Sequence, residues 1–429
     1  MAAPPPRSRR TFLRVALAAG AGGALAPTAA WGRPSPPVAP AVQKITVLRV
    51  PGTFYRPIAM NAYDDAPKGK AGSVRLVRVV LADGTTGVGV EGYARIDDTT
   101  VEGLRRDVLG ANPLAFYRWS GDRIEGVSPD YESVLRDVRY AWLESALLDA
   151  VGTLKGRPVY ALFGEPLRTR VDAYDGTLYF KDVELRAGPD AVGRVAARIR
   201  EDGYRALKMK VGRPYKWMDE APGLDRDIAA IRAARESVGA SFTLMADANN
   251  GYQDRFDDGL RLLRETAPCD LHWMEELMPE TTDRYRRLRR ATREEGVHVR
   301  FAEGENALWD ADASIQRADD VTTWVQDGLV DVIQPDLRTV GFSTVLAMAD
   351  LAARHGATLV PHNWQSEIGK LMGIHAAMLR RNVRFVEDDR WSNVALDTSD
   401  YRFRDGQWRA PDTPGWGIRL TDHYDRFAR

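Results

Sequence analysis

YRALKMKV, at residues 204–211, has the apolar composition of a buried strand and carries two lysines, Lys208 and Lys210, near its end. Side chains two residues apart on a strand point to the same face. The two ammonium groups are therefore expected to lie side by side, where mutual repulsion and burial both lower the pKa of a lysine. A lysine with a lowered pKa can act as a general base near neutral pH. A lysine pair alone is more typical of a solvated strand edge, so the surrounding sequence must distinguish the two interpretations.

Similar short apolar runs occur throughout residues 170–387, where they alternate with amphipathic segments rich in arginine and alanine. They recur about every 25 to 40 residues, which is the spacing of strand–helix units in a parallel sheet. The other runs are VDAYDGT (171–177), SFTLMAD (241–247), DLHWMEE (270–276), HVRFAEGE (298–305), VDVIQPD (330–336), ATLVPHN (357–363) and VRFVED (383–388). Eight such strands predict an α/β fold in which residues 170–387 close into a (β/α) barrel.

The sequence before the barrel has a different organisation. Residues 44–93 alternate between apolar and polar side chains, as strands and hairpins do. Residues 99–163 have apolar side chains at helical spacing. We therefore predict an α+β domain at residues 44–165, and we expect the C-terminal tail, residues 388–429, to fold back on it.

The composition is that of an ordinary soluble globular protein. Of the 429 residues, 60 are Lys or Arg and 60 are Asp or Glu, so the formal net charge is zero. This balance predicts no nucleic-acid partner and no attraction to an anionic membrane. The single cysteine, Cys269, excludes an internal disulfide framework and a multi-cysteine metal site. GVGVEG (87–92) matches a dinucleotide-binding pattern, but no helix opens there, so we predict no nucleotide cofactor.

The N-terminus carries a basic segment followed by small apolar residues. SRRTFLR (8–14) precedes VALAAGAGGALA (15–26), and a proline-rich stretch extends to about residue 40. The paired arginines in this setting resemble a twin-arginine export signal. The apolar part is too short to span a bilayer as a helix. We therefore predict that residues 1–40 are a signal peptide and linker, and that the protein is periplasmic or extracellular, with cleavage after Ala30 as one option.

Each predicted barrel strand ends in charged or polar residues, and the chemistry of such barrels takes place at these strand ends. The residues, in strand order, are Lys208 and Lys210, Asp247 and Asn249, Glu275 and Glu276, Glu303 and Glu305, Asp336, His362, and Glu387. Three successive strands that end in carboxylates place about three negative charges in one small ring, where they repel one another. A divalent cation would relieve this repulsion, and an all-oxygen ligand set suits Mg²⁺.

His362 ends a strand that lies almost opposite the strand of the two lysines in an eight-membered ring. Asp336, on the neighbouring strand, can accept the Nδ1–H of His362 and hold the imidazole in one tautomer. A metal flanked by a lysine pair and a His–Asp pair suits removal of a weakly acidic proton next to a carboxylate. The metal and Glu387 would then stabilise the oxygens of the resulting enediolate.

These residues fall in motifs that occur, in the same order, in one known family. The motifs are KMK (208–210), MADANN (245–250), WMEE (273–276), GEN (304–306), QPD (334–336), VPHN (360–363) and VED (386–388). From residue 44 onward the chain resembles the mandelate racemase subgroup of the enolase superfamily, whose sites use a Lys or His base with Mg²⁺. The resemblance implies a capping domain at residues 44–165, completed by residues 388–429, and a modified (β/α)7β barrel.

The resemblance also implies roles for individual residues. The implied Mg²⁺ ligands are Asp247, Glu275 and Glu305. The implied catalytic residues are Lys208, Lys210, Asp336, His362 and Glu387. In this set Lys210 is one base, and Lys208 lowers its pKa and contacts the substrate carboxylate. His362 with Asp336 is the second acid/base, and Glu387 donates a hydrogen bond to the enediolate.

Two departures from the family pattern affect the ligand assignment. The family commonly has a proline directly after the paired glutamates, whereas here the next proline is Pro279. The fifth strand ends in two glutamates, Glu303 and Glu305. The GEN motif favours Glu305 as the ligand, and Glu303 would then face the helix layer.

Substrate specificity is expected to come from loops of the capping domain above the barrel mouth. The candidate substrate contacts are Asn249, Arg56 and Tyr93, and the loop positions considered with them are Thr53, Phe54, Tyr55 and Arg95. Arg56 or Arg95 could bind the distal end of a polar acid, and each could equally be an ordinary surface residue.

An enediolate with acid/base groups on both faces has two main outcomes. Loss of a β-hydroxyl protonated by His362 dehydrates an acid sugar to a 2-keto-3-deoxy acid, and the resemblance makes this the favoured prediction. Reprotonation on the other face gives a racemase or epimerase of a 2-hydroxy acid. A secreted glycoside hydrolase and an inactive sugar-acid-binding protein are further alternatives, but neither needs the lysine pair. The predicted partner is a small-molecule carboxylate, and the resemblance implies a homo-oligomer.

Overall fold

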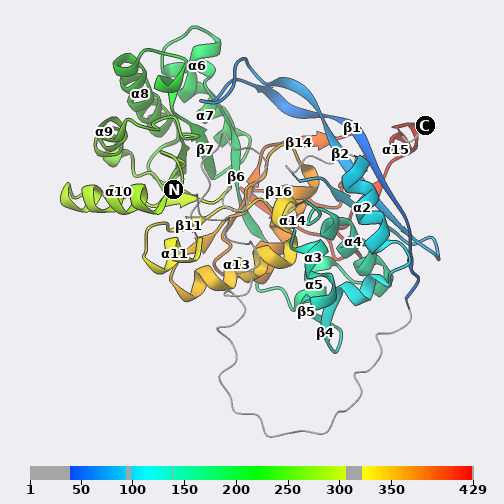
Figure 1. Ribbon diagram of the computed structural model, residues 1–429. Helices are drawn as coiled ribbons and strands as arrows, with labels where there is room; N and C mark the ends of the chain where they lie inside the picture. Colours follow the sequence, from blue (N-terminus) through cyan, green and yellow to red (C-terminus); the bar gives the residue numbers. More distant parts are fainter. Residues whose placement is uncertain (1–38, 93–97, 138, 306–320, 428–429) are drawn as a thin grey trace, which may run out of the picture. The chain divides into compact units, whose positions relative to one another are not determined.

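Eight parallel strands form the central sheet of the computed structural model, which describes residues 39–92, 98–137, 139–305 and 321–427 (Figure 1). The strands are β6 (Val171–Leu178), β7 (Ala206–Lys210), β8 (Thr243–Asp247), β9 (Met274–Glu275), β10 (Phe301–Glu303), β11 (Val332–Ile333), β12 (Thr358–Leu359) and β13 (Phe385–Asp388). From β6 to β12 each strand pairs with the next along the chain, and β13 returns to pair with β6. A parallel bridge between Leu359 and Val383 joins β12 to the segment before β13. The ring is thereby closed, and the predicted barrel is confirmed.

The barrel interior contains one layer of side chains to which each strand segment contributes one residue. The layer consists of Tyr174, Ala206, Met245, Trp273, Ala302, Val332, Val360 and Phe385. Because side chains alternate along a strand, the residue two positions further along each strand faces the same interior. Those residues include Lys208, Asp247, Glu275, His362 and Glu387. The strand period therefore directs the predicted catalytic groups into the barrel mouth.

Helices connect the barrel strands and cover their outer faces. They are α6 (Lys181–Glu184), α7 (Asp190–Glu201), α8 (Glu220–Val238), α9 (Phe256–Thr266), α10 (Thr282–Glu294), α11 (Val321–Gln326), α12 (Leu337–Val340), α13 (Phe342–Arg354) and α14 (Glu367–Leu379), with 3-10 turns at Arg213–Tyr215 and Ala267–Cys269. Side-chain caps begin three of them: Ser366 accepts from the backbone N–H of Gly369 at 2.9 Å before α14, Thr281 accepts from that of Arg284 before α10, and Asp336 accepts from that of Arg338 at 2.8 Å before α12. The buried faces of these helices complete the hydrophobic core.

An antiparallel sheet and short helices precede the barrel. The sheet contains β1 (Val42–Ile58), β2 (Gly69–Leu81) and β3 (Thr86–Val90), which appear in blue in Figure 1. The remaining elements are α2 (Asp98–Val108), β4 (Tyr117–Ser120), β5 (Arg123–Val127), α3 (Glu132–Leu135), α4 (Leu143–Lys155) and α5 (Val159–Phe163), with 3-10 turns at Pro113–Phe116 and Pro129–Tyr131. Helix α4 packs closely on β3. A side chain at Gly89 of β3 would not fit, since its Cβ atom would lie 2.1 Å from Oγ of Ser145 in α4. This is the α+β organisation that the sequence predicts.

The C-terminal tail contacts both parts of the fold. Strand β14 (Trp391–Asn393) extends the antiparallel sheet by pairing with β1, as expected. The hairpin of β16 (Arg402–Arg404) and β17 (Gln407–Arg409) instead pairs with the barrel strand β6. Strand β15 (Leu396–Asp397) precedes this hairpin and pairs with β18 (Arg419–Leu420), and the tail ends with α15 (Asp422–Phe427). Since Ala39–Arg429 form one compact unit, the domain boundary near residues 165–170 stays a prediction.

The predicted export signal lies almost entirely outside the described residues, which begin at Ala39. None of the helices in the described part of the chain has the length and apolar character needed to cross a membrane.

Candidate active site

Lys208 occupies the centre of a buried charge cluster at the ends of the barrel strands. Its Nζ atom lies 2.7 Å from Oε1 of Glu275, 2.9 Å from Oε1 of Glu387 and 3.5 Å from Oδ2 of Asp247. All four side chains are buried. The neighbouring Lys210 donates a hydrogen bond to Asp247. The structure therefore brings together both predicted lysines and three predicted carboxylates.

The pKa values of the two lysines differ from the expectation. Burial lowers the pKa of Lys208, but Glu275 and Glu387 raise it by more, and the result lies well above the usual value. Burial and Lys208 also lower the pKa of Lys210, while Asp247 raises it above normal. Mutual repulsion of the lysines is thus present but outweighed. The predicted low lysine pKa is wrong for this arrangement, because nearby carboxylates compensate both charges.

His362 forms the predicted pair with Asp336. Nδ1 of His362 lies 3.0 Å from Oδ2 of Asp336, and a backbone bridge also joins the two residues. Arg338 donates to the same carboxylate and, with His362, lowers the pKa of Asp336 despite its burial. Burial lowers the pKa of His362, but Glu305, Asp336 and Glu387 raise it to about 9. The imidazole is accordingly positioned as a proton donor.

Glu387 lies between the lysines and His362. Its Oε2 atom accepts a hydrogen bond from the backbone N–H of Asn363 at 2.8 Å, and its Oε1 atom faces Lys208. Burial raises the pKa of Glu387, but Lys208 and His362 lower it below normal. The predicted role of Glu387 as a hydrogen-bond donor needs a proton that this arrangement disfavours.

The two glutamates after β10 have different environments. Glu303 is buried and accepts a hydrogen bond from the hydroxyl of Tyr285 in α10, so it faces the helix layer. Glu305 turns toward the barrel mouth, where its Oε1 atom lies 3.5 Å from Nε2 of His362. The preference for Glu305 agrees with this placement, and its role as a metal ligand stays a prediction.

The paired glutamates of β9 also diverge. Glu275 faces Lys208 and accepts from the indole N–H of Trp273 at 3.2 Å, and burial raises its pKa to about 7. Glu276, at a backbone φ of 44°, accepts from Nδ2 of Asn249 at 2.9 Å. Burial, Glu305 and Asp247 raise the pKa of Glu276 well above normal. Glu276 therefore competes with Glu275 for the role of metal ligand.

The carboxylates at the barrel mouth have the chemistry of a Mg²⁺ site. Among the described residues, no group of three or more His, Cys, Asp and Glu side chains is close enough to hold a metal as arranged. The ammonium groups of Lys208 and Lys210 engage Asp247 and Glu275 instead. The donor chemistry nevertheless fits Mg²⁺, because all candidates are carboxylates. The repulsion that Glu305 and Asp247 exert on Glu276 is one that a cation would relieve.

Arg56 does not point toward these groups. Its Nη2 atom lies 2.7 Å from Oδ2 of Asp202 and 3.8 Å from Oδ2 of Asp175, and Arg390 pairs with the same Asp202 at 2.6 Å. Asp175 follows the inward-facing Tyr174, so it faces out of the barrel. Because Arg56 is engaged in this outer ion-pair network, we correct the prediction and no longer expect it to contact substrate.

The capping segment contributes different residues from those expected. Nδ2 of Asn61 donates to Oδ1 of Asn249 at 2.9 Å, and Nδ2 of Asn250 donates to the hydroxyl of Tyr63 at 2.6 Å. Burial and Glu276 raise the pKa of Tyr63. Asn249 is thus the one predicted substrate contact at the mouth, while Tyr93 and Arg95 lie outside the described residues.

The loop that follows β1 carries a sequence signal, the turn-forming residue Asn61. The side-chain oxygen of Asn61 accepts from the backbone N–H groups of Tyr63 and Asp64, which is the turn that asparagine favours. The loop directly follows β1, and the indole N–H of Trp217 donates to the carbonyl of Asn61 at 2.7 Å. Phe54, by contrast, is buried, with its ring 4.8 Å from that of Trp364.

Comparisons with known proteins agree with this architecture. The profile of the family described as enolase C-terminal domain-like matches residues 191–424. A D-galactarolactone cycloisomerase of Agrobacterium fabrum is 29% identical over 359 residues, which cover 80% of this chain and 88% of that protein.

Two solved structures from Geobacillus species are similar over most of their length. A galacturonate dehydratase complexed with D-galacturonate and 5-keto-4-deoxy-D-galacturonate is 28% identical, with a TM-score of 0.76, and the match covers 90% of this chain and 96% of that one. A mandelate racemase/muconate lactonizing protein complexed with magnesium/tartrate is also 28% identical, with a TM-score of 0.76 and coverage of 90% and 94%.

The family match covers more than half of the chain. Its span contains all of the predicted metal ligands and catalytic residues, from Lys208 to Glu387. The resemblance inferred from the motifs is confirmed by these matches, and this chain belongs to the enolase C-terminal domain-like family.

Proposed function

We propose that this protein is an Mg²⁺-dependent enzyme that removes the α-proton of a small-molecule carboxylate and dehydrates an acid sugar to a 2-keto-3-deoxy acid. The observation that carries the proposal is the buried cluster in which the Lys208–Lys210 pair and the His362–Asp336 pair flank carboxylates at the barrel mouth. The similar galacturonate dehydratase supports the choice of dehydration.

The residues have distinct parts in this proposal. Mg²⁺ would be held by Asp247, Glu275 and Glu305, where it would supply positive charge to the substrate carboxylate. The magnesium complex of a similar structure supports this choice of metal. Lys208 binds the substrate carboxylate. Lys210 removes the α-proton after its own ammonium group has lost a proton.

His362 completes the reaction on the other side of the substrate. With its pKa raised to about 9, the imidazolium holds a proton that it can give to the leaving β-hydroxyl. Asp336 fixes the ring orientation. Loss of water then yields the enol, which becomes the keto acid.

Racemisation or epimerisation is the second candidate function. Two acid/base groups, Lys210 and His362, could exchange the α-proton on either face, and this arrangement favours the second candidate if the substrate lacks a β-hydroxyl. The buried lysine pair has no use in a two-carboxylate glycoside hydrolase, so that alternative receives no support from the site.

The proposal is tested by incubating the purified protein with Mg²⁺ and a panel of acid sugars in D₂O, including D-galacturonate, and following the products by ¹H NMR. Keto-acid formation supports dehydration, whereas α-deuterium in a recovered substrate or epimer supports the second function. D-galactarolactone belongs in the panel because a relative isomerises it. The enolase-type proposal is wrong if no acid sugar in the panel gives a keto acid or gains α-deuterium, and if EDTA has no effect on the spectra.

Export and assembly are proposed separately. The twin arginines at positions 9 and 10 support export to the periplasm or beyond, and similarity to the family supports a homo-oligomer. Replacing both arginines by lysine should retain the full-length precursor in the cytoplasm, and light scattering should report a mass above that of one chain. Unchanged export or a monomeric mass would contradict the respective proposal.

A further inference from the structure

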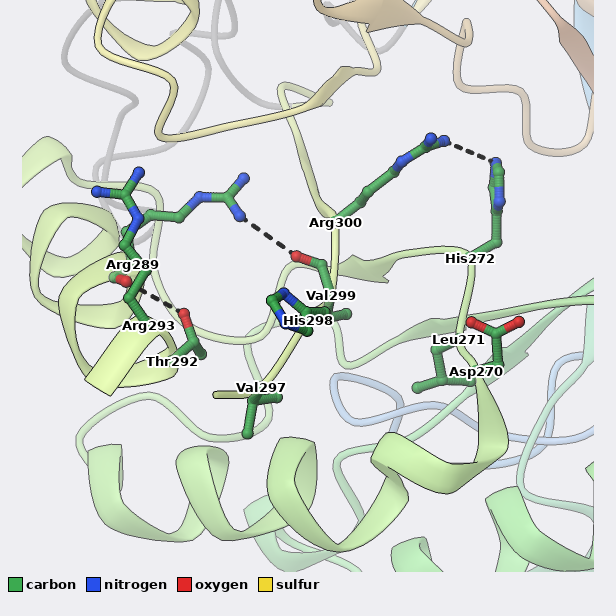
Figure 2. A pocket seen from close by; sticks show the side chains of 10 residues that line it. All are labelled: Asp270, Leu271, His272, Arg289, Thr292, Arg293, Val297, His298, Val299 and Arg300. Atoms are coloured by element: carbon green, nitrogen blue, oxygen red, sulfur yellow. Dashed lines mark hydrogen bonds between the residues drawn. The ribbon is translucent and has the colours of Figure 1, made fainter. Parts of the chain in front are cut away.

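A cavity lies at the opposite end of the barrel from the candidate active site. It has a volume of about 420 Å³ and is lined by residues that precede β9 and β10, together with the last turns of α10 (Figure 2). Catalytic groups of such barrels lie at the carboxyl ends of the strands, so this cavity is outside the proposed catalytic site. Its volume is in the range of sites for small molecules.

The polar lining of the cavity is mostly basic. Its ionisable residues are Asp270, His272, Arg289, Arg293, His298 and Arg300. Arg289 builds the wall: its Nε atom donates to the carbonyl of Leu329 at 3.0 Å, its Nη1 atom to that of Val299 at 3.2 Å, and it also pairs with Asp331. Its charge is therefore already compensated.

The other two arginines have donors to spare. Arg293 and His298 form no side-chain hydrogen bond or ion pair with any residue that the structure describes. Arg300 makes one such contact, in which Nη1 lies 3.4 Å from Nε2 of His272 (Figure 2). Arg293 and Arg300 are both exposed, and Asp270 is the one carboxylate among the residues that line the cavity.

His272 holds this arrangement in place. Burial, Arg300 and Arg384 lower the pKa of His272 to about 4, so the ring is neutral and its Nε2 atom can accept from Arg300. The imidazole also packs 5.4 Å from the ring of Trp273 and 5.8 Å from that of Phe385, both of which belong to the barrel interior. His272 therefore links the cavity lining to the aromatic side chains of the barrel interior.

We propose that this cavity binds a small oxyanion, a phosphate-bearing or dicarboxylic metabolite, through Arg293 and Arg300. Guanidinium groups bind phosphate and carboxylate oxygens in a bidentate manner, and charge-assisted bonds of this kind are the strongest that the lining can form. Phosphate and dicarboxylate share this chemistry, and direct binding measurements distinguish the two sources.

The experiment is isothermal titration calorimetry of the purified full-length protein with inorganic phosphate and, separately, with succinate, which lacks an α-hydroxyl group. We expect one of the two to bind at one site per chain. Arg293→Gln and Arg300→Gln should each weaken binding at least about tenfold, because each removes a charge-assisted contact. The better ligand of the wild-type protein identifies the source.

Arg290→Gln is the matched control, because Arg290 lies on the same helix, is exposed and does not line the cavity. It should change affinity by less than about twofold, and unchanged thermal unfolding should verify that all three variants fold. Equal weakening by all three variants would indicate diffuse charge attraction and overturn the proposal. The proposal would also be overturned if both cavity variants kept the wild-type affinity. It would likewise be overturned if neither anion bound at a concentration of about 10 mM.

Discussion

Nζ of Lys208 lies 2.7 Å from Oε1 of Glu275, although the two residues are 67 positions apart in the sequence. The contact joins the strand end of β7 to that of β9, with Asp247 of β8 between them. A buried ammonium group compensated by carboxylates keeps its proton. Positive charge brought to those carboxylates by a metal would weaken their hold on the lysines, so metal binding and base activation are expected to be coupled.

Lys210→Ala should lower exchange of the substrate α-proton at least about 100-fold, since the variant lacks the proposed base. The exchange is measured by ¹H NMR in D₂O with a substrate found in the acid-sugar panel. Lys44→Ala, which changes an exposed lysine, is the control and should leave the rate unchanged. Equal rates in Lys210→Ala and the wild-type protein would remove Lys210 from the mechanism.

His362→Asn should lower the rate of keto-acid formation more than the rate of α-proton exchange. The reason is that the proposed imidazolium protonates the leaving hydroxyl, which follows removal of the α-proton. A loss of dehydration of about 100-fold or more is expected from the absence of a general acid. Both rates can be read from the same NMR time course. If exchange and dehydration decline in parallel, His362 also acts in the first step, and the assignment of separate faces fails.

The metal ligands can be distinguished with two isosteric variants. Glu275→Gln should weaken Mg²⁺ binding at least about tenfold, because Glu275 faces into the barrel beside Asp247 and the substitution removes a carboxylate ligand. Glu276→Gln should weaken it less, since Glu276 is outside the ligand set that the motifs imply and the amide oxygen of the variant can still accept from Asn249. Calorimetric titration with Mg²⁺ measures both, and the reverse order would assign the ligand role to Glu276.

Tyr63→Phe should raise KM several-fold with little change in kcat, since the hydroxyl of Tyr63 meets Asn250 at the barrel mouth and the lysines are untouched. Tyr55→Phe is the control, because Tyr55 is more than half exposed on the same capping segment. A loss of kcat at constant KM would instead place the Tyr63 hydroxyl in the chemical step.

Stability should fall with rising pH because of Glu144, a buried carboxyl of α4. Burial raises its pKa from 4.5 to about 7, although Ser343 donates to it. The folded state thus favours the protonated form, so this stabilisation is complete below pH 4.5 and is lost as the pH rises through 7. Relative to Glu144→Gln, the wild-type protein should lose about 3 kcal/mol between pH 5 and 8 in urea unfolding. If the free energy of unfolding of the wild-type protein and of Glu144→Gln changed in parallel with pH, folding would not raise the pKa of Glu144, and the prediction would be wrong.

The sequence determined the barrel and the composition of its mouth. Period-two alternation in short apolar runs is a local property, and it directs Lys208 and Lys210 to one face of β7. The same rule, applied to β8 and β9, places Asp247 and Glu275 beside them. The GEN motif favours Glu305 over Glu303, and Glu303 faces the helix layer, where it accepts from the hydroxyl of Tyr285.

Only the tertiary structure decided the charge state of the lysines and the capping residues at the mouth. The pKa of Lys208 depends on Glu275 and Glu387, which reach it from other strands. Whether Arg56 or Asn61 reaches the mouth depends on how β1 ends and on which acidic partners lie nearby. Periodicity specifies the face on which a side chain lies, whereas electrostatic energy depends on distances between residues that only folding brings together.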